Sequence, residues 1–284
     1  MSAIVNISSE CLSVFISTRG AELMSVKKGD TELLWQGDPA FWTGRAPLLF
    51  PVCGALRDDK YVFNGKEYKL PKHGFTRGSE FTAEVVEPAR AVFLLKSNEE
   101  TLKMYPFEFE LRVIYEVAES KLRVTYLVKN LGDEDMYYSI GAHEAYACPE
   151  GIEEYSVIFD ECEDLDAARL DGVLIGTATK SLGKCTRELQ LKNEYFKEDA
   201  LIFLNLKSRR VTLRNRNSGR EVKLDFNGFN YFLIWMKPGA GYVCLEPWRG
   251  ITDFYNSNYD FRTKPGINSI GAGETDVSVH TIEF

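Results

Sequence analysis

Hydrophobic and polar residues alternate along most of the chain, the pattern of strands that bury one face. The longest examples are "FEFELRVIYEV" and "KLRVTYLVKN", which the short segment "AES" joins. Further alternating runs are "AELMSVKKGDTELLW", "KYVFNGKEYKL", "MYYSIGAHEAY", "VTLRNRNSGREVKLDF", "NYFLIWM", "GYVCLEPW" and "DVSVHTIEF". Turn signals separate these runs at intervals of roughly 8 to 12 residues, which predicts a large antiparallel sandwich or barrel.

Glycine-containing turns predict where hairpins form. Asn64-Gly65 separates two alternating runs and is the strongest short hairpin signal, because both central positions of such a turn need positive φ. Gly29-Asp30 and Asn217-Ser218-Gly219 occupy equivalent places in two other runs. We therefore expect three hairpins around these turns.

Helical periodicity is weak, and no apolar stripe extends beyond about two helical turns. The segments "DPAFW" and "NEYFKEDA" are expected to form short helical turns, the first with Asp38 as N-cap and Pro39 at the first helical position. Nothing in mid-chain has the composition of a linker. The sequence therefore predicts an all-β protein, with residues 1–284 forming a single domain.

Composition narrows the class of protein. The chain is 44% hydrophobic and 27% charged, as expected of a soluble globular protein. Its net charge of −8 argues against general nucleic-acid binding, and we expect the arginines of "SRRVTLRNRNSGR" to form a solvated hairpin face. The start "MSAIVNISSECLSVF" lacks the features of a signal peptide, and no apolar run is long enough for a transmembrane helix. We expect a cytoplasmic protein with neither nucleic-acid nor membrane partners.

Six cysteines are scattered along the chain without a CxxC motif. Neither a zinc knuckle nor a thioredoxin-type redox pair is indicated. We expect reduced, mostly buried thiols. The glycines of "PGAGY" and "GINSIGAGET" lack the strand-to-helix context of a dinucleotide-binding loop.

Three residues are candidates for chemistry. His143 ends an alternating strand in "SIGAHEAYACP", where small neighbours leave room beside its ring. Glu246 follows an apolar run in "VCLEPWRG", so we expect its carboxyl group to be desolvated and its pKa raised. Considered one at a time, each residue has an equally good structural explanation: His143 as a core histidine with its hydrogen bonds satisfied, and Glu246 as part of a buried salt bridge. His73, in "HGFTRGSEF", has polar, glycine-broken surroundings that are not typical of a packing residue.

Three motifs, considered together, favour a functional role for these residues over a structural one. They are "GRAPLLFPVCGALRDDKYVFNGKEYKLPKHGFTRGSEF", "IGAHEAY" and "CLEPWRGITDF", in this order. From about Asn6 to the C-terminus the chain resembles the aldose 1-epimerase (galactose mutarotase-like) superfamily, and most of all its LacX-type bacterial branch, which is close to the hexose-6-phosphate mutarotases. The resemblance implies a supersandwich of large antiparallel sheets, in agreement with the strand pattern. It implies no metal and no organic cofactor.

The resemblance also implies roles for individual residues. His143 corresponds to the general acid and Glu246 to the general base. His73 and Arg45 correspond to cleft residues, His73 as a contact of the sugar, and Asp199, in "KEDALIF", to an acidic residue that holds sugar hydroxyls.

Three further positions either differ from the family pattern or bear on the substrate. The family commonly has "GAHPAF", whereas this chain has Glu144 and Tyr146, which we expect to alter the cleft wall. In the hexose-6-phosphate branch an arginine at the position of Arg77 helps to hold the phosphate. The alternative for Arg77 is an exposed ion pair with Glu80 or another acid, which would contribute only about 0 to 1 kcal/mol.

The expected activity is the interconversion of α and β anomers of an aldohexose by acid–base ring opening and reclosure. Imidazole and a desolvated carboxyl group can both give and take protons near neutral pH. A glycosidase would need two suitably placed carboxyl groups, whereas this set pairs one carboxylate with histidines. A hexose-6-phosphate mutarotase and a non-catalytic sugar-binding protein of the same fold remain open alternatives. The sugar itself, and the choice between monomer and homodimer, also remain open.

Overall fold

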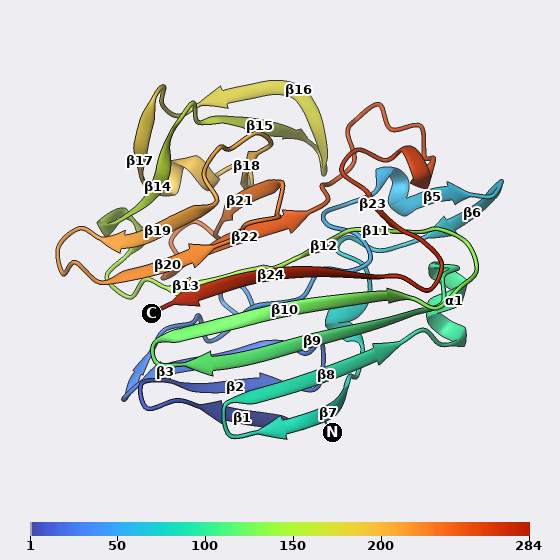
Figure 1. The fold of residues 1–284 in the computed structure, drawn as a ribbon. Coiled ribbons are helices and arrows are strands. Elements are labelled where there is room, and N and C mark those ends of the chain that lie inside the picture. Colours follow the sequence, from blue (N-terminus) through green and yellow to red (C-terminus); the bar gives the residue numbers. More distant parts are fainter. Residues whose placement is uncertain (1) are drawn as a thin grey trace.

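The structure is a computed structural model that describes residues 2–284, most of which lie in antiparallel β-sheets or the turns between them (Figure 1). The largest sheet has nine strands. In spatial order they are β17 (Thr186–Gln190), β14 (Tyr155–Glu163), β19 (Arg210–Asn215), β20 (Glu221–Asp225), β24 (Thr275–Glu283), β10 (Lys121–Asn130), β9 (Phe109–Ala118), β8 (Arg90–Lys96) and β7 (Thr82–Glu87). The expectation of an all-β, antiparallel architecture is confirmed.

A seven-stranded sheet carries the residues of the candidate site. Its strands are β12 (Ile140–Gly141) and β13 (Glu144–Ala147), which both pair with β22 (Tyr242–Arg249), and then β21 (Tyr231–Trp235), β18 (Leu201–Phe203), β15 (Asp166–Asp171) and β16 (Leu174–Ser181). Because β12 and β13 both pair with β22, the short segment of chain between them is held beside β22 from both of its ends.

Three smaller sheets complete the strand set. They are β1 (Ile4–Ser8), β2 (Ser13–Ser17), β3 (Leu23–Lys28) and β4 (Thr31–Glu32), then β5 (Lys60–Phe63) with β6 (Lys66–Lys69), and β11 (Met136–Tyr138) with β23 (Asn268–Ile270). Hairpins form at the three expected turns, as β3–β4, β5–β6 and β19–β20. In the second of them Asn64 and Gly65 have φ values of 49° and 73°, as the turn chemistry requires.

Helical structure is confined to short segments. The α-helix α1 (Glu99–Met104) begins at Asn98, whose side chain accepts from the N–H groups of Glu100 and Thr101. The 3₁₀ helices are η1 (Arg57–Asp59), η2 (Thr76–Gly78), η3 (Ile152–Glu154), η4 (Asn193–Phe196) and η5 (Phe261–Thr263). Of the two expected helical turns, "NEYFKEDA" begins with η4, whereas "DPAFW" forms only a hydrogen-bonded turn in which the Asp38 carbonyl accepts from two following N–H groups. Within residues 2–284 no helix is long and apolar enough to cross a membrane.

The alternating pattern decides which face of each strand is buried. In β9, Leu111 and Val113 are fully buried while Arg112 between them is partly exposed. Large aromatic side chains fill much of the space beneath the sheets, and Phe50 packs against Tyr105 and Phe109 with ring centroids 5.9 and 5.1 Å apart. Offset and edge-to-face contacts of this kind add to the stabilisation from burial.

The expectation that all cysteines are unpaired is wrong for one pair. Cys162 and Cys185 form a disulfide, with Cα atoms 5.0 Å apart. They are separated by 23 positions in sequence, but each cysteine adjoins one member of the Glu163–Thr186 pair between β14 and β17, where the register shifts, so the pairing of these strands brings the two cysteines close together. The β15–β16 hairpin lies between them in sequence and hides this proximity. The other cysteines are free, with Cys11 exposed and the remaining three buried.

Candidate active site

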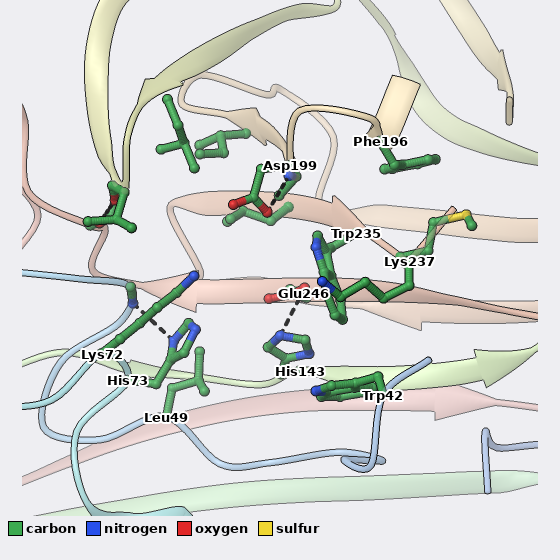
Figure 2. Close-up of a pocket in the computed structure, with 18 of the residues that line it drawn as sticks. Trp42, Leu49, Lys72, His73, His143, Phe196, Asp199, Trp235, Lys237 and Glu246 are labelled. Carbon is green, nitrogen blue, oxygen red and sulfur yellow. Dashed lines mark hydrogen bonds and ion pairs between the residues drawn. The ribbon is translucent and has the colours of Figure 1, made fainter. Parts of the chain in front are cut away.

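A pocket of about 500 Å³ lies over the seven-stranded sheet. Its lining comes from β15, β18, β21 and β22 of this sheet and from loops and 3₁₀ helices that are far apart in the sequence. His73, His143, Asp199 and Glu246 all face it (Figure 2). With Arg77, which also lines the pocket, five of the six residues expected in a sugar site are brought together here.

Strand register places His143 opposite Glu246. Glu144 pairs with Leu245 in this antiparallel ladder, so His143, one position earlier, lies opposite Glu246, one position later. His143 Nε2 and Glu246 Oε1 are 3.4 Å apart, and both side chains are buried (Figure 2). The two groups form the floor of the pocket.

Burial shifts the pKa values of these two groups in opposite directions. It lowers the pKa of His143 to about 3 and raises the pKa of Glu246 well above its usual value, although the positive charge of Lys72 opposes the latter shift. Both shifts arise because removal of water disfavours imidazolium and carboxylate alike. Counted from neutral imidazole and carboxylate, the pair with one added proton has no net charge, whereas the pair with two added protons is positive and the pair with none is negative. The site therefore favours the one-proton state of the pair.

The backbone around His73 fixes its ring. His73 and Gly74 have φ values of 68° and 71°, and a Cβ atom on Gly74 would lie only 2.1 Å from the Phe50 carbonyl oxygen. The Gly54 N–H donates to His73 Nδ1 at 3.1 Å, which assigns the ring proton to Nε2. Burial lowers the pKa of His73, and the neighbouring His143 and basic side chains add to this shift. His73 is therefore a neutral imidazole with one N–H available as a donor.

Asp199 lies across the pocket from His73, in the loop between η4 and β18 (Figure 2). Its φ of 151° is unusual for a residue other than glycine, and its Oδ1 accepts from the Ala200 N–H at 2.8 Å. This hydrogen bond holds the half-buried carboxylate in a fixed direction.

Aromatic side chains form one wall beside the histidine. The ring of Trp42 stacks on His143 with centroids 5.1 Å apart and planes at 28°, and Trp235 meets His143 edge-on at 5.6 Å. Sequence reasoning missed both tryptophans, because nothing local to "DPAFW" or "NYFLIWM" indicates that their rings converge. Such a wall restricts the imidazole to one plane.

Four basic side chains lie at the pocket: Lys72, Arg77, Lys197 and Lys237. All four are exposed, and within residues 2–284 none has a carboxylate oxygen within 4.0 Å. Glu80, the expected surface partner of Arg77, instead accepts a hydrogen bond from the Thr18 hydroxyl. Lys72 was also missed, although its position directly before "HGF" would have singled it out.

The structure does not bring Arg45 to the pocket lining. Its guanidinium group donates to the Gln36 carbonyl at 2.8 Å, and its own carbonyl accepts from the Ala145 N–H. Trp42, three positions earlier, occupies the pocket wall instead. Arg45 thus braces the loop and strand beside the site.

The expectation that Glu144 and Tyr146 alter the cleft wall is wrong. Successive residues of a strand point to opposite faces, so Glu144 points away from the pocket that His143 faces. Its Oε1 lies 2.9 Å from Nε2 of His280, on β24 of the nine-stranded sheet, and both side chains are buried. Tyr146 is fully buried as well. Glu144 therefore joins the two large sheets behind the site.

Comparisons with known proteins show the family of this chain. The family model described as aldose 1-epimerase matches residues 4–267. The plasmid and chromosomal LacX proteins of Lactococcus lactis subsp. lactis are each 35% identical to this chain over 281 residues, which covers 94% of both chains.

Solved structures of similar proteins have the same fold. A galactose mutarotase related enzyme from Lactobacillus acidophilus has a TM-score of 0.93 and 32% identity, covering 99% of this chain and 97% of that one. A galactose mutarotase-like protein from Lactobacillus casei has a TM-score of 0.93 and 27% identity, covering 99% of each chain. The expected galactose mutarotase-like sandwich is confirmed, and the chain belongs to the aldose 1-epimerase family.

Proposed function

We propose that this protein interconverts the α and β anomers of an aldohexose by ring opening and reclosure. The observation that carries the proposal is the buried pair of His143 and Glu246, 3.4 Å apart at the floor of the pocket. Such a pair can hold one proton and pass it between two oxygen atoms of a bound sugar.

The chemistry needs two proton transfers in each direction. Glu246, as general base, removes the proton of the C1 hydroxyl, while His143, as general acid, protonates the ring oxygen and yields the open-chain aldehyde. Rotation about C1–C2 presents the other carbonyl face, and the reverse transfers close the ring. For this direction of transfer the single proton of the pair starts on His143, and after ring opening the pair again holds one proton, now on Glu246. In reclosure Glu246 protonates the carbonyl oxygen and His143 takes back the proton of the ring-closing hydroxyl.

His73 and Asp199 would position the sugar. The His73 Nε2–H can donate to a hydroxyl and the Asp199 carboxylate can accept from others, from opposite sides of the pocket. Two fixed contacts keep C1 and the ring oxygen aligned with the proton-transfer groups while the aldehyde rotates. A sugar-binding protein without catalysis has no need of a matched acid and base, which favours the enzyme.

Polarimetry tests the proposal directly. Freshly dissolved α-glucose or α-galactose should reach its equilibrium rotation faster with catalytic amounts of the protein than in buffer alone. Rates that stay at the buffer value over a panel of free and phosphorylated aldoses, with NMR exchange between anomers as the second readout, would overturn it.

A hexose 6-phosphate is a second candidate substrate, and the unpaired cations at the pocket favour it. Arg77 can present a planar fork to two phosphate oxygens, and Lys72 adds a second positive charge nearby. Since the protein as a whole is acidic, four cations at one pocket are a local feature that a phosphate would neutralise.

Arg77→Ala distinguishes the two substrates. If Arg77 holds the phosphate, the substitution should lower kcat/KM for glucose 6-phosphate by about 10- to 100-fold, the worth of a charged hydrogen bond, and leave glucose unaffected. Arg210→Ala is the control, because it removes an equal charge from an exposed pair with Asp225 outside the pocket. Equal losses on both sugars, or none, would rule out phosphate recognition by Arg77.

A further inference from the structure

We propose that the floor of the pocket is also a binding site for a borderline-soft divalent cation such as Zn²⁺ or Cd²⁺. Its ligands would be His143, Glu246 and the thiol of Cys244, with a fourth position open to water or a sugar hydroxyl. Occupancy would block anomer interconversion, and this consequence rests on the proposed function, whereas binding itself does not.

Strand register builds this cluster. Cys244 lies two residues before Glu246 on β22, so both side chains point to the same face of the strand. Cys244 pairs with Ala145 on β13, and His143, two residues before Ala145, shares that face as well. Cys244 is therefore the diagonal neighbour of His143 across the ladder, a separation that side chains can bridge.

The distances suit a tetrahedral ion. One donor atom from each of the three residues lies within 4.8 Å of the others. Tetrahedral Zn²⁺ has bonds of about 2.0 to 2.2 Å to nitrogen and oxygen, which places those two atoms roughly 3.4 Å apart. His143 Nε2 and Glu246 Oε1 are 3.4 Å apart. Zn–S bonds of about 2.3 Å would require the sulfur atom to approach by up to about 1 Å.

The chemistry of the three groups selects the class of ion. Neutral imidazole and thiolate are ligands of zinc and cadmium, whereas Mg²⁺ and Ca²⁺ prefer sites made of oxygen atoms. Among residues 2–284 His143 Nδ1 has no hydrogen-bond partner, and Nε2 lies 3.4 Å from Glu246 Oε1, so the ring can present a lone pair to an ion. A metal ion bound to the thiol displaces its proton.

The site would oppose catalysis because two of its ligands are the proposed proton-transfer groups. A cation held by the Glu246 carboxylate and a His143 nitrogen removes both lone pairs that must accept protons from the sugar. Cys244 takes no part in the proposed reaction, is fully buried and is not one of the residues that line the pocket. Its substitution can therefore separate metal binding from turnover.

Inhibition of the whole protein by ZnCl₂ tests the proposal. Zn²⁺ should inhibit reversibly, EDTA should restore the full rate, and MgCl₂ at the same concentration should have no effect. Cys244→Ala should keep the metal-free rate and need at least about tenfold more Zn²⁺ for half-inhibition, since even indirect supports of a metal site are worth 10- to 100-fold in affinity. Cys11→Ala, at the exposed free thiol, should respond as the wild type does.

A CdCl₂ titration supplies a readout that does not depend on activity. The wild type and Cys11→Ala should each show the ultraviolet thiolate-to-cadmium charge-transfer band of a bound thiol, saturating near one equivalent. Cys244→Ser, a nearly isosteric variant, should lack this saturating band. Equal bands in wild type and Cys244→Ser, or Zn²⁺ inhibition that is the same in wild type and Cys244→Ala, would overturn the site. If the protein proves inactive on all sugars, the cadmium band still decides whether the site exists.

Discussion

Glu246→Gln should lower kcat for anomer interconversion by about 10² to 10⁴, the usual contribution of a positioned general base. Glutamine keeps the size of the side chain and can still accept from a sugar hydroxyl, but its amide cannot take up the C1 hydroxyl proton. Because Glu246 is buried and has a raised pKa, the neutral amide also resembles its protonated form, so the fold should tolerate it.

The effect should fall on kcat far more than on KM, since an interaction made only in the transition state is lost. Polarimetry over a range of sugar concentrations measures both constants, and thermal unfolding verifies that the variant is folded. A folded variant that keeps more than about a tenth of the wild-type rate removes Glu246 from the role of general base.

The pH profile of the wild type checks the same assignment. Burial lowers the pKa of His143 to about 3, so the second proton binds to the pair only in strong acid. Burial raises the pKa of Glu246, so the single proton is lost only well above the usual range of a glutamate. We therefore expect kcat/KM to show no increase as the pH rises through about 6.5, where an ordinary histidine titrates. An increase centred there would contradict the one-proton pair.

His143→Asn should reduce kcat by a similar factor, about 10² to 10⁴. Asparagine can imitate one hydrogen bond of the imidazole, but it cannot deliver a proton to the ring oxygen or take it back. Its smaller side chain leaves space beneath Trp42, whose ring stacks on His143, but creates no unpaired buried charge.

The matched comparison is His73→Asn, at the other pocket histidine. A residue that only holds a sugar hydroxyl should affect KM at least as much as kcat, so the two histidines should differ in this ratio. If His143→Asn retains wild-type kcat, or if both variants change KM alone, His143 is a sugar contact and not the general acid.

Much of the fold follows from local pattern. Alternation in "FEFELRVIYEV" and "KLRVTYLVKN" corresponds to β9 and β10, because burial of one face of a strand needs period-two spacing whatever its neighbours are. Asn64-Gly65 predicted the β5–β6 hairpin because these two residues by themselves favour the backbone conformation of its turn. The six-residue helix α1 was not predicted, since a segment of this length carries too few turns to show a period.

For the candidate site, too, some features follow from the local sequence and others from the tertiary structure. The sequence by itself determined the residue types at His73, His143, Asp199 and Glu246, and the apolar strand that buries Glu246. Only the tertiary structure decided which of the motif residues face one pocket, because that depends on how loops cross the ends of a sheet. Arg45 therefore donates to a backbone carbonyl beside the pocket.

Contacts between segments that are far apart in the sequence could not be predicted either. The Cys162–Cys185 disulfide, the Glu144–His280 contact and the approach of His143 to Cys244 and Glu246 all join residues that are far apart in the sequence. A local pattern reports which face of a strand is buried, but it cannot report the strand that lies opposite. Strand order and register are set by packing of the whole chain, so the sequence specified the chemical groups and the fold decided which of them meet.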